Sequence, residues 1–573
     1  MTRAGVDTGG TFTDVVRSDG TIAKVLSTPG DPAQAVAVGL GDRAVDVLAH
    51  GTTVATNALL ERRGARVALV TDPGFEDVIE IGRQNRPALY DQFADRPAPL
   101  VERELRLPVG AAVPDGVEAV AVCLLHADVD PSGERDVAAT LVGYDVTCSH
   151  EVSPEFREYE RTVTVVANAY LRPVCRAYLH RLAPLADRVL AMTSAGGLVP
   201  LDEAADRPAA LLLSGPAGGV RAGAAAAVAA GFGDAVTFDM GGTSTDVCLV
   251  LDGQPEPAGQ RAVGGLPIRL PALDIHTVGA GGGSIARLDS GGALAVGPRS
   301  AGADPGPACY GQGGELPTVT DADLVLGRIP PDAAFPGLGR LDVSAARAAL
   351  ERAGVDAAGV VDVVDATMAE ALRVVSVRRG VDPAGLALVA FGGAGPLHAC
   401  ALAEQLGMPA VVVPPRAGVL SAVGLLASPR QTDVVRSWPH AGDLAGVAAA
   451  LAELAERARA AHGEEAEITT SVDCRYAGQS HELTVSDIGH FEEEHRRRNG
   501  YARPGAPVEV VALRATARSA APVRMDELPA VGDRRHAVGP AVLAEPDCTV
   551  WVPEGWSAEV GGGGAWILRR SRS

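Results

Sequence analysis

Lysine is almost absent from this chain of 573 residues: Lys24 is its single lysine, and arginine supplies the other basic side chains apart from histidine. A Walker A loop requires a lysine after its glycines, and no G-x-x-x-x-G-K-[ST] stretch occurs. Pyridoxal phosphate and biotin also attach through a lysine, and Lys24 is a poor candidate for that role. Any phosphate chemistry is therefore expected to use backbone amides and hydroxyl groups.

Aromatic residues are also few, and the net charge of the chain is negative. Phe, Trp and Tyr make up 4% of the chain, which argues against a stacking platform for single-stranded nucleic acid. A formal net charge of −21 disfavours nucleic acid and anionic membranes as partners. The longest apolar run, residues 222–232, is too short to span a bilayer, and the N-terminus lacks the charged and apolar regions of a signal peptide. We expect a cytoplasmic protein with no nucleic-acid or membrane partner.

The cysteine pattern excludes two further classes of protein. Eight cysteines are scattered along the chain without any C-x-x-C pair, so neither a zinc cage nor a disulfide framework is predicted. Most lie in apolar stretches and are expected to be reduced core residues. Cys309, in GPACYGQGG, is the one expected in a loop.

The order of predicted elements indicates an α/β protein with three regions. Residues 1–165 alternate apolar strands with helices, and residues 166–430 form a second such block with a Gly/Pro-rich insertion. This alternation favours mainly parallel sheets with right-handed crossovers. Residues 431–573 begin with an amphipathic helix and continue as alternating strands, which predicts a smaller C-terminal α+β domain.

Two stretches of the chain are nearly the same: GVDTGGTFTDVV at 5–16 and VTFDMGGTSTDVCLV at 236–250. In each, an apolar strand enters a Gly-Gly turn whose backbone a ligand can approach closely. The amides and Thr hydroxyls of such a turn suit phosphate oxygens. The leading carboxylates, Asp7 and Asp239, suit a hydrated Mg²⁺ that bridges phosphates, and Asp14 and Asp246 could add a metal-binding or water-positioning carboxylate.

A single copy of this motif would more often be an ordinary β-hairpin. Two copies, each after an apolar strand, favour two facing phosphate-binding turns in two lobes. The stretch FGGAGPLHA at 391–399 supports this interpretation, because Gly392, Gly393 and Gly395 allow a base or ribose to lie against bare backbone. Its spacing does not match the Rossmann dinucleotide fingerprint, and a plain tight turn is the alternative.

Together these motifs resemble the actin-like ATPase superfamily, and most closely the hydantoinase A/5-oxoprolinase family. That family includes N-methylhydantoinase A and the ATP-binding subunits of acetone and acetophenone carboxylases. The resemblance extends over nearly the whole chain. It is carried by these stretches: HGTTVATNALLERRG, GFEDVIEIGRQNRPALYD, EYERTVTVVANAYLRP, SGPAGGV, FDMGGTSTDV, VGAGGGSIA, SAGADPGPACYG, PTVTDADLVLGRI and GPAVLAEPDCTVWVPEGW.

The resemblance implies two actin-like (ribonuclease H-like) lobes around a nucleotide cleft, with ATP and Mg²⁺ as cofactors. Asp7, Asp14, Asp239 and Asp246 are then the expected catalytic carboxylates, with Asp7 and Asp239 as metal ligands. The expected nucleotide contacts are Gly9, Gly10, Thr11, Thr13, Gly241, Gly242, Thr243, Thr245, Gly392, Gly393 and Gly395.

Substrate contacts are harder to predict. The polar quartet Arg83, Gln84, Asn85 and Arg86 is able to bind a carbonyl or carboxylate, although residue types alone favour a solvated loop. A second candidate set lies at a strand end and could instead cap a helix: His50, Thr52 and Thr53. Asp274 and His276 could bind a metal but more often form a local hydrogen bond, and His398 is expected to pack on its helix.

The predicted function is an ATP-dependent hydrolase subunit that opens a cyclic amide or imide, such as a hydantoin or 5-oxoproline, by phosphoryl activation of its carbonyl. The alternative within the family is the ATP-binding subunit of a ketone carboxylase. An alternative of another class is an ATP-driven switch of the actin or Hsp70 type. Because the hydrolytic domain of fused 5-oxoprolinases is missing, the resemblance also implies a separate B-type partner subunit and an oligomer.

Overall fold

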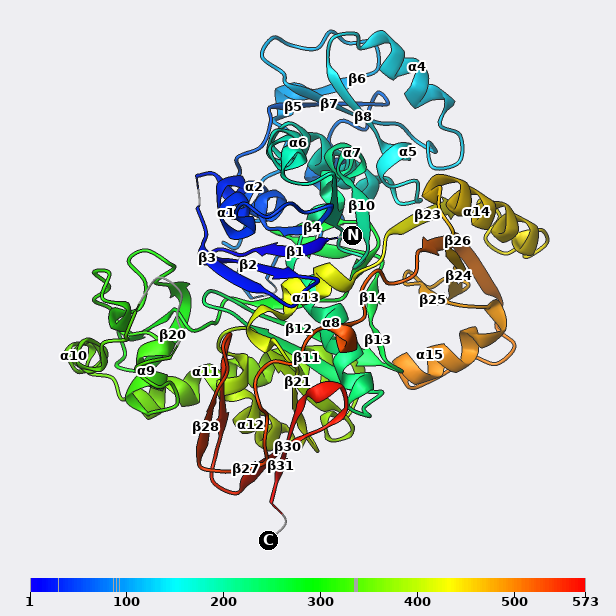
Figure 1. Cartoon of the computed structure of the whole chain (residues 1–573). Helices are drawn as coiled ribbons and strands as arrows, with labels where there is room; N and C mark the ends of the chain where they lie inside the picture. The colour runs from blue at the N-terminus through cyan, green and yellow to red at the C-terminus, as the bar shows by residue number, and fades with distance from the viewer. Residues whose placement is uncertain are drawn as a thin grey trace.

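The computed structural model describes residues 2–28, 30–85, 87–88, 90–91, 93–333 and 339–571. Two α/β lobes form its centre, with two smaller units attached to them (Figure 1).

The first lobe is built on a six-stranded sheet of order β10-β9-β4-β1-β2-β3. Strands β1, β4 and β9 run parallel, whereas β1–β2, β2–β3 and β9–β10 are antiparallel pairs. All six residues of β4 are buried, because the strand lies inside the sheet and helices cover the sheet faces. The elements are β1 (Arg3–Thr8), β2 (Phe12–Arg17), β3 (Ile22–Leu26), β4 (Val47–Thr52), β9 (Arg188–Met192), β10 (Leu198–Pro200), α1 (Pro32–Leu40), α2 (Val54–Leu60), α6 (Glu158–Leu182) and α7 (Leu201–Asp206).

The second lobe repeats this plan. Its sheet has the order β13-β12-β11-β21-β22-β31-β30-β27, with β18 pairing with β12. The hairpin β11–β12 lies beside the parallel strand β21, just as β1–β2 lies beside β4. The elements are β11 (Ala235–Met240), β12 (Thr245–Leu251), β13 (Gln254–Pro255), β18 (His276–Val278), β21 (Ala387–Phe391), β22 (Val411–Val413), β27 (Ala537–Val538), β30 (Trp556–Val560), β31 (Trp566–Arg570), α11 (Ala357–Val375) and α12 (Gly395–Leu406).

The two similar stretches form equivalent hairpins. Asp7 pairs with Asp14 across the first hairpin, and Asp239 pairs with Asp246 across the second. The same backbone bond closes each turn: Gly9 N donates to Phe12 O at 3.0 Å, and Gly241 N donates to Ser244 O at 3.0 Å. The predicted pair of related lobes is therefore confirmed.

Two helices pass between the lobes and fix their spacing. Helix α8 (Gly215–Ala229) packs against the second-lobe sheet, and α13 (Leu420–Ala427) packs against both β1 and α8. Both helices begin at the cleft between the hairpins, because Gly215 and Ser421 line that cleft.

Two smaller units extend from this centre (Figure 1). A parallel sheet of order β6-β5-β7-β8 packs on α6, and its strands are β5 (Val67–Thr71), β6 (Arg106–Pro108), β7 (Ala119–Cys123) and β8 (Asp145–Cys148). The C-terminal α+β unit has an antiparallel sheet of order β23-β26-β24-β25, with α14 packed on it. Its elements are β23 (Gln431–Ser437), β24 (Glu467–Tyr476), β25 (Leu483–Val485), β26 (Val508–Arg518), α14 (Val447–His462) and α15 (Phe491–Asn499).

The sheets do not follow the three predicted regions strictly. The first-lobe sheet extends beyond residue 165, because β9 pairs with β4 and β10 pairs with β9. In the last region, β27, β30 and β31 join the second-lobe sheet through the pairing of β31 with β22. These strands cover sheet edges, and such pairing depends on tertiary structure that local sequence does not specify.

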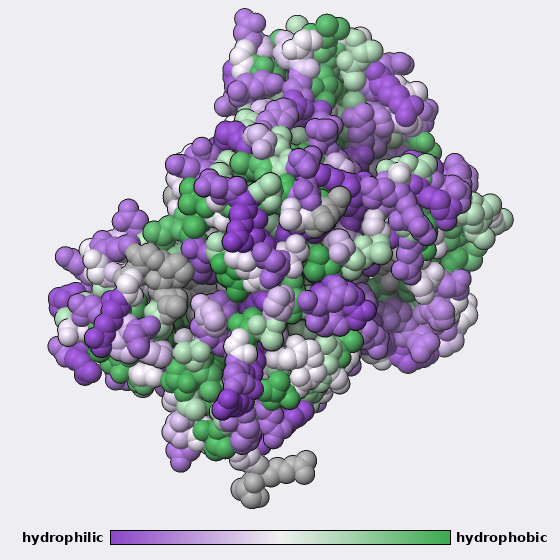
Figure 2. Space-filling model, viewed as in Figure 1, coloured by the Kyte–Doolittle hydropathy of each residue, from purple (hydrophilic) through white to green (hydrophobic). Residues whose placement is uncertain are grey.

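On the face shown in Figure 2, hydrophilic residues predominate, with apolar ones scattered between them. Among the helices in the described part of the chain, none is both long enough and apolar enough to cross a membrane. The eight cysteines all lie in the described ranges, are buried and form no disulfide. Cys309, expected in a loop, lies in a one-turn 3-10 helix (Ala308–Tyr310) and is buried.

Candidate functional site

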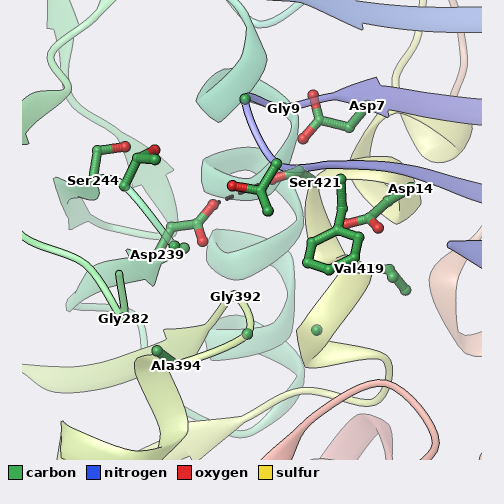
Figure 3. Close-up of a pocket in the computed structure, with 18 of the residues that line it drawn as sticks. Asp7, Gly9, Asp14, Asp239, Ser244, Gly282, Gly392, Ala394, Val419 and Ser421 are labelled. Carbon is green, nitrogen blue, oxygen red and sulfur yellow. Dashed lines mark hydrogen bonds between the residues drawn. The ribbon is translucent and has the colours of Figure 1, made fainter. Parts of the chain in front are cut away.

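A cavity of about 630 Å³ lies between the lobes and is lined by both hairpin turns. Figure 3 shows Asp7, Gly9 and Asp14 on the first-lobe side, and Asp239 and Ser244 facing them from the second lobe. Cavities of a few hundred cubic ångströms are typical of small-molecule and cofactor sites.

The alternation of side chains along a strand determines which residues of the two hairpins line this cavity. Asp7 and Asp14 are cross-strand partners and both line the cavity, as do Asp239 and Asp246. The alternate residues point the other way, because successive side chains of a strand face opposite sides. Thr13 and Thr245 are buried instead: Thr13 bonds to Ser27 Oγ at 3.1 Å, and Thr245 Oγ1 donates to the Ala280 carbonyl at 2.6 Å. The other turn residues predicted to contact a nucleotide line the cavity: Gly9, Gly10, Thr11, Gly241, Gly242 and Thr243.

The four aspartates share a poorly solvated space that disfavours negative charge. Burial, together with the charges of Asp14 and Asp239, raises the pKa of Asp7 well above its ordinary value. Burial and the charge of Asp246 raise the pKa of Asp239 to about 7. Burial raises the pKa of Asp246 to about 6, although the Thr277 hydroxyl donates to Asp246 Oδ1 at 2.5 Å. The site is therefore suited to a bound cation that offsets these charges.

The single lysine of the chain lies in this cavity. Lys24 is directly opposite Asp14 in the antiparallel pair β2–β3, and its Nζ lies 2.7 Å from Asp14 Oδ1. Burial raises the pKa of Asp14, and the Lys24 charge and hydrogen bond oppose that rise. Lys24 thus counters one of the four carboxylates, a role its position in the sequence does not reveal.

A glycine-rich wall lies on the second-lobe side of the cavity. Gly392 and Gly393 line it, and Gly392 has a φ of +79°. A Cβ on Gly392 would lie 2.4 Å from Asp239 Oδ1, so this position requires glycine. Gly395, the third predicted glycine, begins α12 and is not among the residues that line the cavity. Gly282 N and Gly283 N donate to the carbonyls of Gly241 and Gly242, which ties the VGAGGG stretch to the second hairpin.

The structure brings only part of the predicted substrate set to the cavity. Thr52 and Thr53 line it, whereas His50 is fully buried between the Val6 carbonyl at 3.2 Å and the Tyr178 hydroxyl at 2.7 Å. Burial lowers the pKa of His50 to about 4. Thr52 is on the same face of β4 as His50 but ends the strand at the cavity, whereas His50 lies two residues earlier, under Tyr178 of α6, where a cleft-facing side chain was expected.

The three described residues of the polar quartet do not reach the cavity. Arg83 forms an ion pair with Glu160 of α6 and lies over the Tyr159 ring. Gln84 and Asn85 are exposed and are not among the residues that line the cavity, and Arg86 lies outside the described residues.

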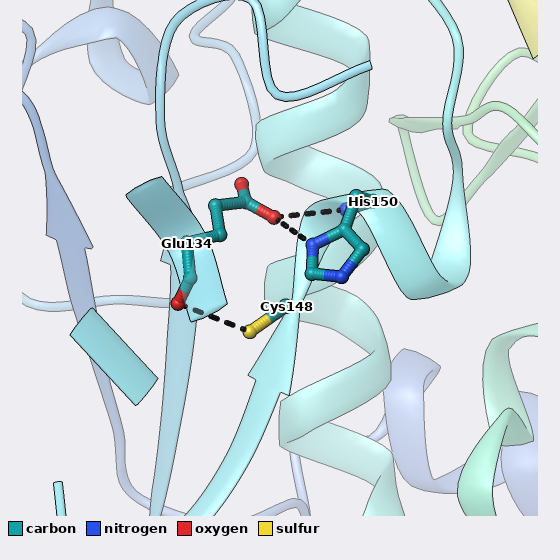
Figure 4. Close-up of side chains that lie close together, drawn as sticks. All are labelled: Glu134, Cys148 and His150. Carbon is teal, nitrogen blue, oxygen red and sulfur yellow. Dashed lines mark hydrogen bonds and ion pairs between the residues drawn. The ribbon is translucent and has the colours of Figure 1, made fainter. Parts of the chain in front are cut away.

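Two other groups were candidates for metal binding. Asp274 pairs with Arg379, and neither Asp274 nor His276 lines the cavity. In the described ranges, one group of three ligand atoms lies within 4.8 Å, and it is Glu134, Cys148 and His150 (Figure 4). Glu134 already accepts four hydrogen bonds, from Leu124 N, Ser149 Oγ, His150 N and His150 Nδ1. Burial raises the pKa of the Cys148 thiol to about 12, so this group is a hydrogen-bond network that joins α4 (Ser132–Thr140) to β8.

His398 was expected to pack on its own helix, α12; it is buried inside the second lobe and pairs with two aspartates, one of which lines the cavity. Its Nδ1 lies 2.7 Å from Asp365 Oδ1, and its Nε2 lies 3.3 Å from Asp323 Oδ2. Burial alone lowers the pKa of His398, but the charges of Asp323 and Asp365 outweigh burial and raise it to about 10. Asp323 lines the cavity beside the glycine-rich wall, so His398 holds the Asp323 side chain in position there.

Sequence reasoning missed several cavity residues because they come from distant parts of the chain. Ser421, at the start of α13, donates from Oγ to Asp239 Oδ2 at 3.3 Å. Asp547 accepts a hydrogen bond from Gly418 N at 2.7 Å, and both residues line the cavity. Lys24 is the exception in distance along the chain, since it lies on β3, the strand that pairs with β2 of the first hairpin.

We predict that Asp239→Asn stabilises the ligand-free protein at neutral and higher pH. The folded pKa of Asp239, about 7, exceeds its ordinary value of 3.8, so the folded state keeps a proton that the unfolded state loses. This proton therefore stabilises the folded state fully below about pH 4, and the stabilisation is lost as pH rises through about 7. Asparagine does not ionise, so the variant should gain on the order of 1–4 kcal/mol at pH 8 and much less at pH 5.

Thermal unfolding of the ligand-free protein at pH 5 and pH 8 checks this prediction. Asp136→Asn, at an exposed acid of α4, is the matched control and should shift neither midpoint. An Asp239→Asn variant less stable than the parent at pH 8 would contradict the assigned electrostatics.

Comparison with known proteins agrees with the resemblance seen in the sequence. The hydantoinase/oxoprolinase N-terminal region matches residues 3–114, and the hydantoinase/oxoprolinase family matches residues 161–433. The caprolactamase subunit alpha of Pseudomonas jessenii is 35% identical over 597 residues, which cover 89% of this chain and 86% of that protein. The 5-oxoprolinase 1 of Arabidopsis thaliana is 36% identical over 73% of this chain, which spans only 41% of that larger protein.

A solved structure extends the comparison to the fold. The crystal structure of the ATP-dependent caprolactamase from Pseudomonas jessenii covers 100% of both chains with a TM-score of 0.85 and 31% identity. The predicted α/β fold of two actin-like ATPase lobes is thereby confirmed. With two matching family regions and a relative aligned over most of both lengths, this chain belongs to the hydantoinase/oxoprolinase family.

Proposed function

We propose that this chain is the ATP-binding subunit of an enzyme that opens a cyclic amide by transferring a phosphoryl group to its carbonyl oxygen. The observation that carries the proposal is the pair of equivalent hairpins, Asp7–Asp14 and Asp239–Asp246, facing each other across one cavity. Phosphoryl transfer depends mainly on positioning and charge neutralisation, which two opposed turns with backbone donors provide.

In this proposal, the chemistry of the cavity walls decides how the nucleotide is oriented. Its phosphates lie between the two turns, where backbone amides and the Thr11 and Thr243 hydroxyls are available as donors. The adenosine lies against Gly392 and Gly393, where the wall continues with the apolar side chains of Leu397 and Ile329. Asp323 stands at this end, so it is available to accept hydrogen bonds from ribose hydroxyls or an amino group.

The carboxylates fit a hydrated Mg²⁺. In the described ranges no three of them bring their oxygens within 4.8 Å of one another, so they form no closed metal cage. Mg²⁺ commonly keeps several waters and binds through one or two carboxylates plus phosphates, which suits Asp7 and Asp239. The pKa values of both residues are raised because buried carboxylates lie close together, and a bound cation would relieve that repulsion. When bound, the ion would neutralise charge on the phosphates during transfer.

The substrate fits the first-lobe end of the cavity. Thr53, Thr56 and Asn57 supply polar groups there, and Leu60 and Leu213 supply apolar surface. A small ring with one amide needs this combination of a few donors on an apolar wall. Transfer of the γ-phosphoryl group to the amide oxygen would break its bond to ADP and make the ring carbon electrophilic. Water would then add to that carbon, the ring C–N bond would break, and hydrolysis of the resulting acyl phosphate would release inorganic phosphate.

The proposal includes a second subunit that completes the hydrolysis. Two observations support it: the caprolactamase relative is named as subunit alpha, and the 5-oxoprolinase relative is more than twice as long as the region matched here. The chain alone is then expected to show slow ATP turnover.

Phosphate release from Mg-ATP tests the proposal, with a panel of lactams, hydantoins, 5-oxoproline and ketones, each with and without a co-purified second subunit. We expect stimulation by at least one cyclic amide. Stimulation only by ketones in the presence of bicarbonate would favour the carboxylase alternative instead. No stimulation by any metabolite would contradict the enzyme proposal and favour an ATP-driven switch.

A further inference from the structure

We propose that Lys24 contacts the ligand directly, its ammonium group donating a hydrogen bond to an anionic oxygen bound in the cavity. Under the proposed function, on which this inference rests, that oxygen belongs to a phosphoryl group of the nucleotide. Lys24 would then supply the side-chain charge that a Walker A lysine supplies elsewhere.

The composition of the cavity wall is the first argument. Among the described residues that line it, Lys24 is the only lysine or arginine, whereas Asp7, Asp14, Asp239 and Asp246 all line it. Glu545 and Asp547 add two more acids on the C-terminal side. A nucleotide brings further negative charge, so a fixed cation inside the cavity interacts strongly with it.

The surroundings of Lys24 hold its ammonium group in place. Nζ donates to Asp14 Oδ2 at 3.0 Å and to the Gly418 carbonyl at 3.3 Å, and it lies 5.2 Å from the centroid of the Phe12 ring. These partners come from the first hairpin and from the segment that leads into α13. The side chain is 17% exposed, so its position is fixed without being sealed from the cavity.

The hydrogen-bond count leaves one donor for a ligand. An ammonium group has three N–H donors, and two of them are directed to Asp14 and Gly418. Asp14 Oδ1 also lies 2.7 Å from Nζ but accepts no hydrogen bond, so among the described residues the third N–H has no hydrogen-bond partner. A charge-assisted bond from this donor would strengthen phosphate binding roughly tenfold to a hundredfold.

Because the chain has a single lysine, a chemical probe reports on this side chain alone. An N-hydroxysuccinimide acetate ester acetylates Lys24 and the chain's α-amino group, and peptide mass spectrometry separates the two. We expect the Mg²⁺ complex of AMPPNP, a non-hydrolysable ATP analogue, to slow Lys24 acetylation at least about tenfold. Adenosine, which occupies the same cavity without phosphates, should leave the rate unchanged.

Variants provide the second readout. Lys24→Met should weaken the binding of Mg-AMPPNP, measured by calorimetry, roughly tenfold to a hundredfold and leave adenosine binding unchanged. Lys24→Arg should retain most of the affinity, because it keeps the charge. Arg43→Met, which removes an exposed charge from the same lobe, is the matched control and should bind like the parent.

The outcomes separate this inference from the proposed function. If Mg-AMPPNP binds but Lys24 is acetylated at the same rate, the Lys24 contact is wrong and the proposed function stands. Equal protection by adenosine would also overturn the contact, because closure of the cavity would then explain it. If Mg-AMPPNP does not bind the parent protein, both proposals fail. The acetylation test uses the parent protein, so it remains decisive even if Lys24→Met does not fold.

Discussion

Asp239→Asn lowers ATP turnover by roughly a thousandfold or more, which is the largest activity loss we expect from a single atom change in this chain. Asp239 contacts several parts of the site. It lies in the second hairpin, accepts a hydrogen bond from Ser421 of α13 and lies against the Gly392 turn. The substitution keeps the size and one acceptor of the side chain but removes the charge that a bound cation requires. Asp7→Asn should have an effect of similar size, because Asp7 holds the equivalent position in the first hairpin.

Loss of folding would not explain this result. The same Asp239→Asn substitution is expected to stabilise the ligand-free protein at pH 8, so activity and stability should move in opposite directions. Steady-state phosphate release measures turnover, and Asp136→Asn is again the control. If Asp7→Asn and Asp239→Asn both retain more than about a tenth of the parent's turnover, the hairpins are not the phosphate-binding turns.

The hairpins could be predicted from the sequence because their information is local. An apolar strand, two glycines and a closing aspartate fix the turn, and the cross-strand pairs Asp7–Asp14 and Asp239–Asp246 follow from it. The same local rule also corrects part of the prediction. Counting alternate residues along β2 places Thr13 behind the sheet as soon as Asp14 is placed in the cavity.

The remaining site residues could not be predicted in this way. Arg83 has the chemistry to bind a carbonyl, but Glu160 of α6 pairs with it, and a pairing 77 residues apart is visible only in the fold. Asp323 reaches the cavity through support from His398, which lies on a different helix. Asp547 comes from the last region of the chain, whose later strands join the second-lobe sheet. Each of these positions is decided by which elements pack together, and the sequence does not contain that information in any single stretch.

Gly424→Val is expected to have the largest effect on stability, although Gly424 contacts no ligand. A Cβ at this position would lie 1.9 Å from the Gly218 carbonyl oxygen, where α13 crosses α8. That oxygen belongs to helix backbone and cannot move aside without displacing the helix. We expect the valine variant to lose about 3 kcal/mol or more of stability, and Gly424→Ala to lose less.

The same substitution should also impair turnover in the molecules that remain folded. Separating the helices displaces Ser421 at the start of α13 and, through it, the bond to Asp239 Oδ2. A shift of about 1 Å in a positioned group commonly costs on the order of a hundredfold in rate.

Denaturant unfolding and phosphate release measure the two effects. Gly442→Val is the matched control, since an added Cβ there has nothing within 4 Å. A Gly424→Val protein with the parent's unfolding midpoint would show that the spacing of the two helices does not hold the lobes together. Loss of stability with unchanged turnover would show that the cavity tolerates that displacement.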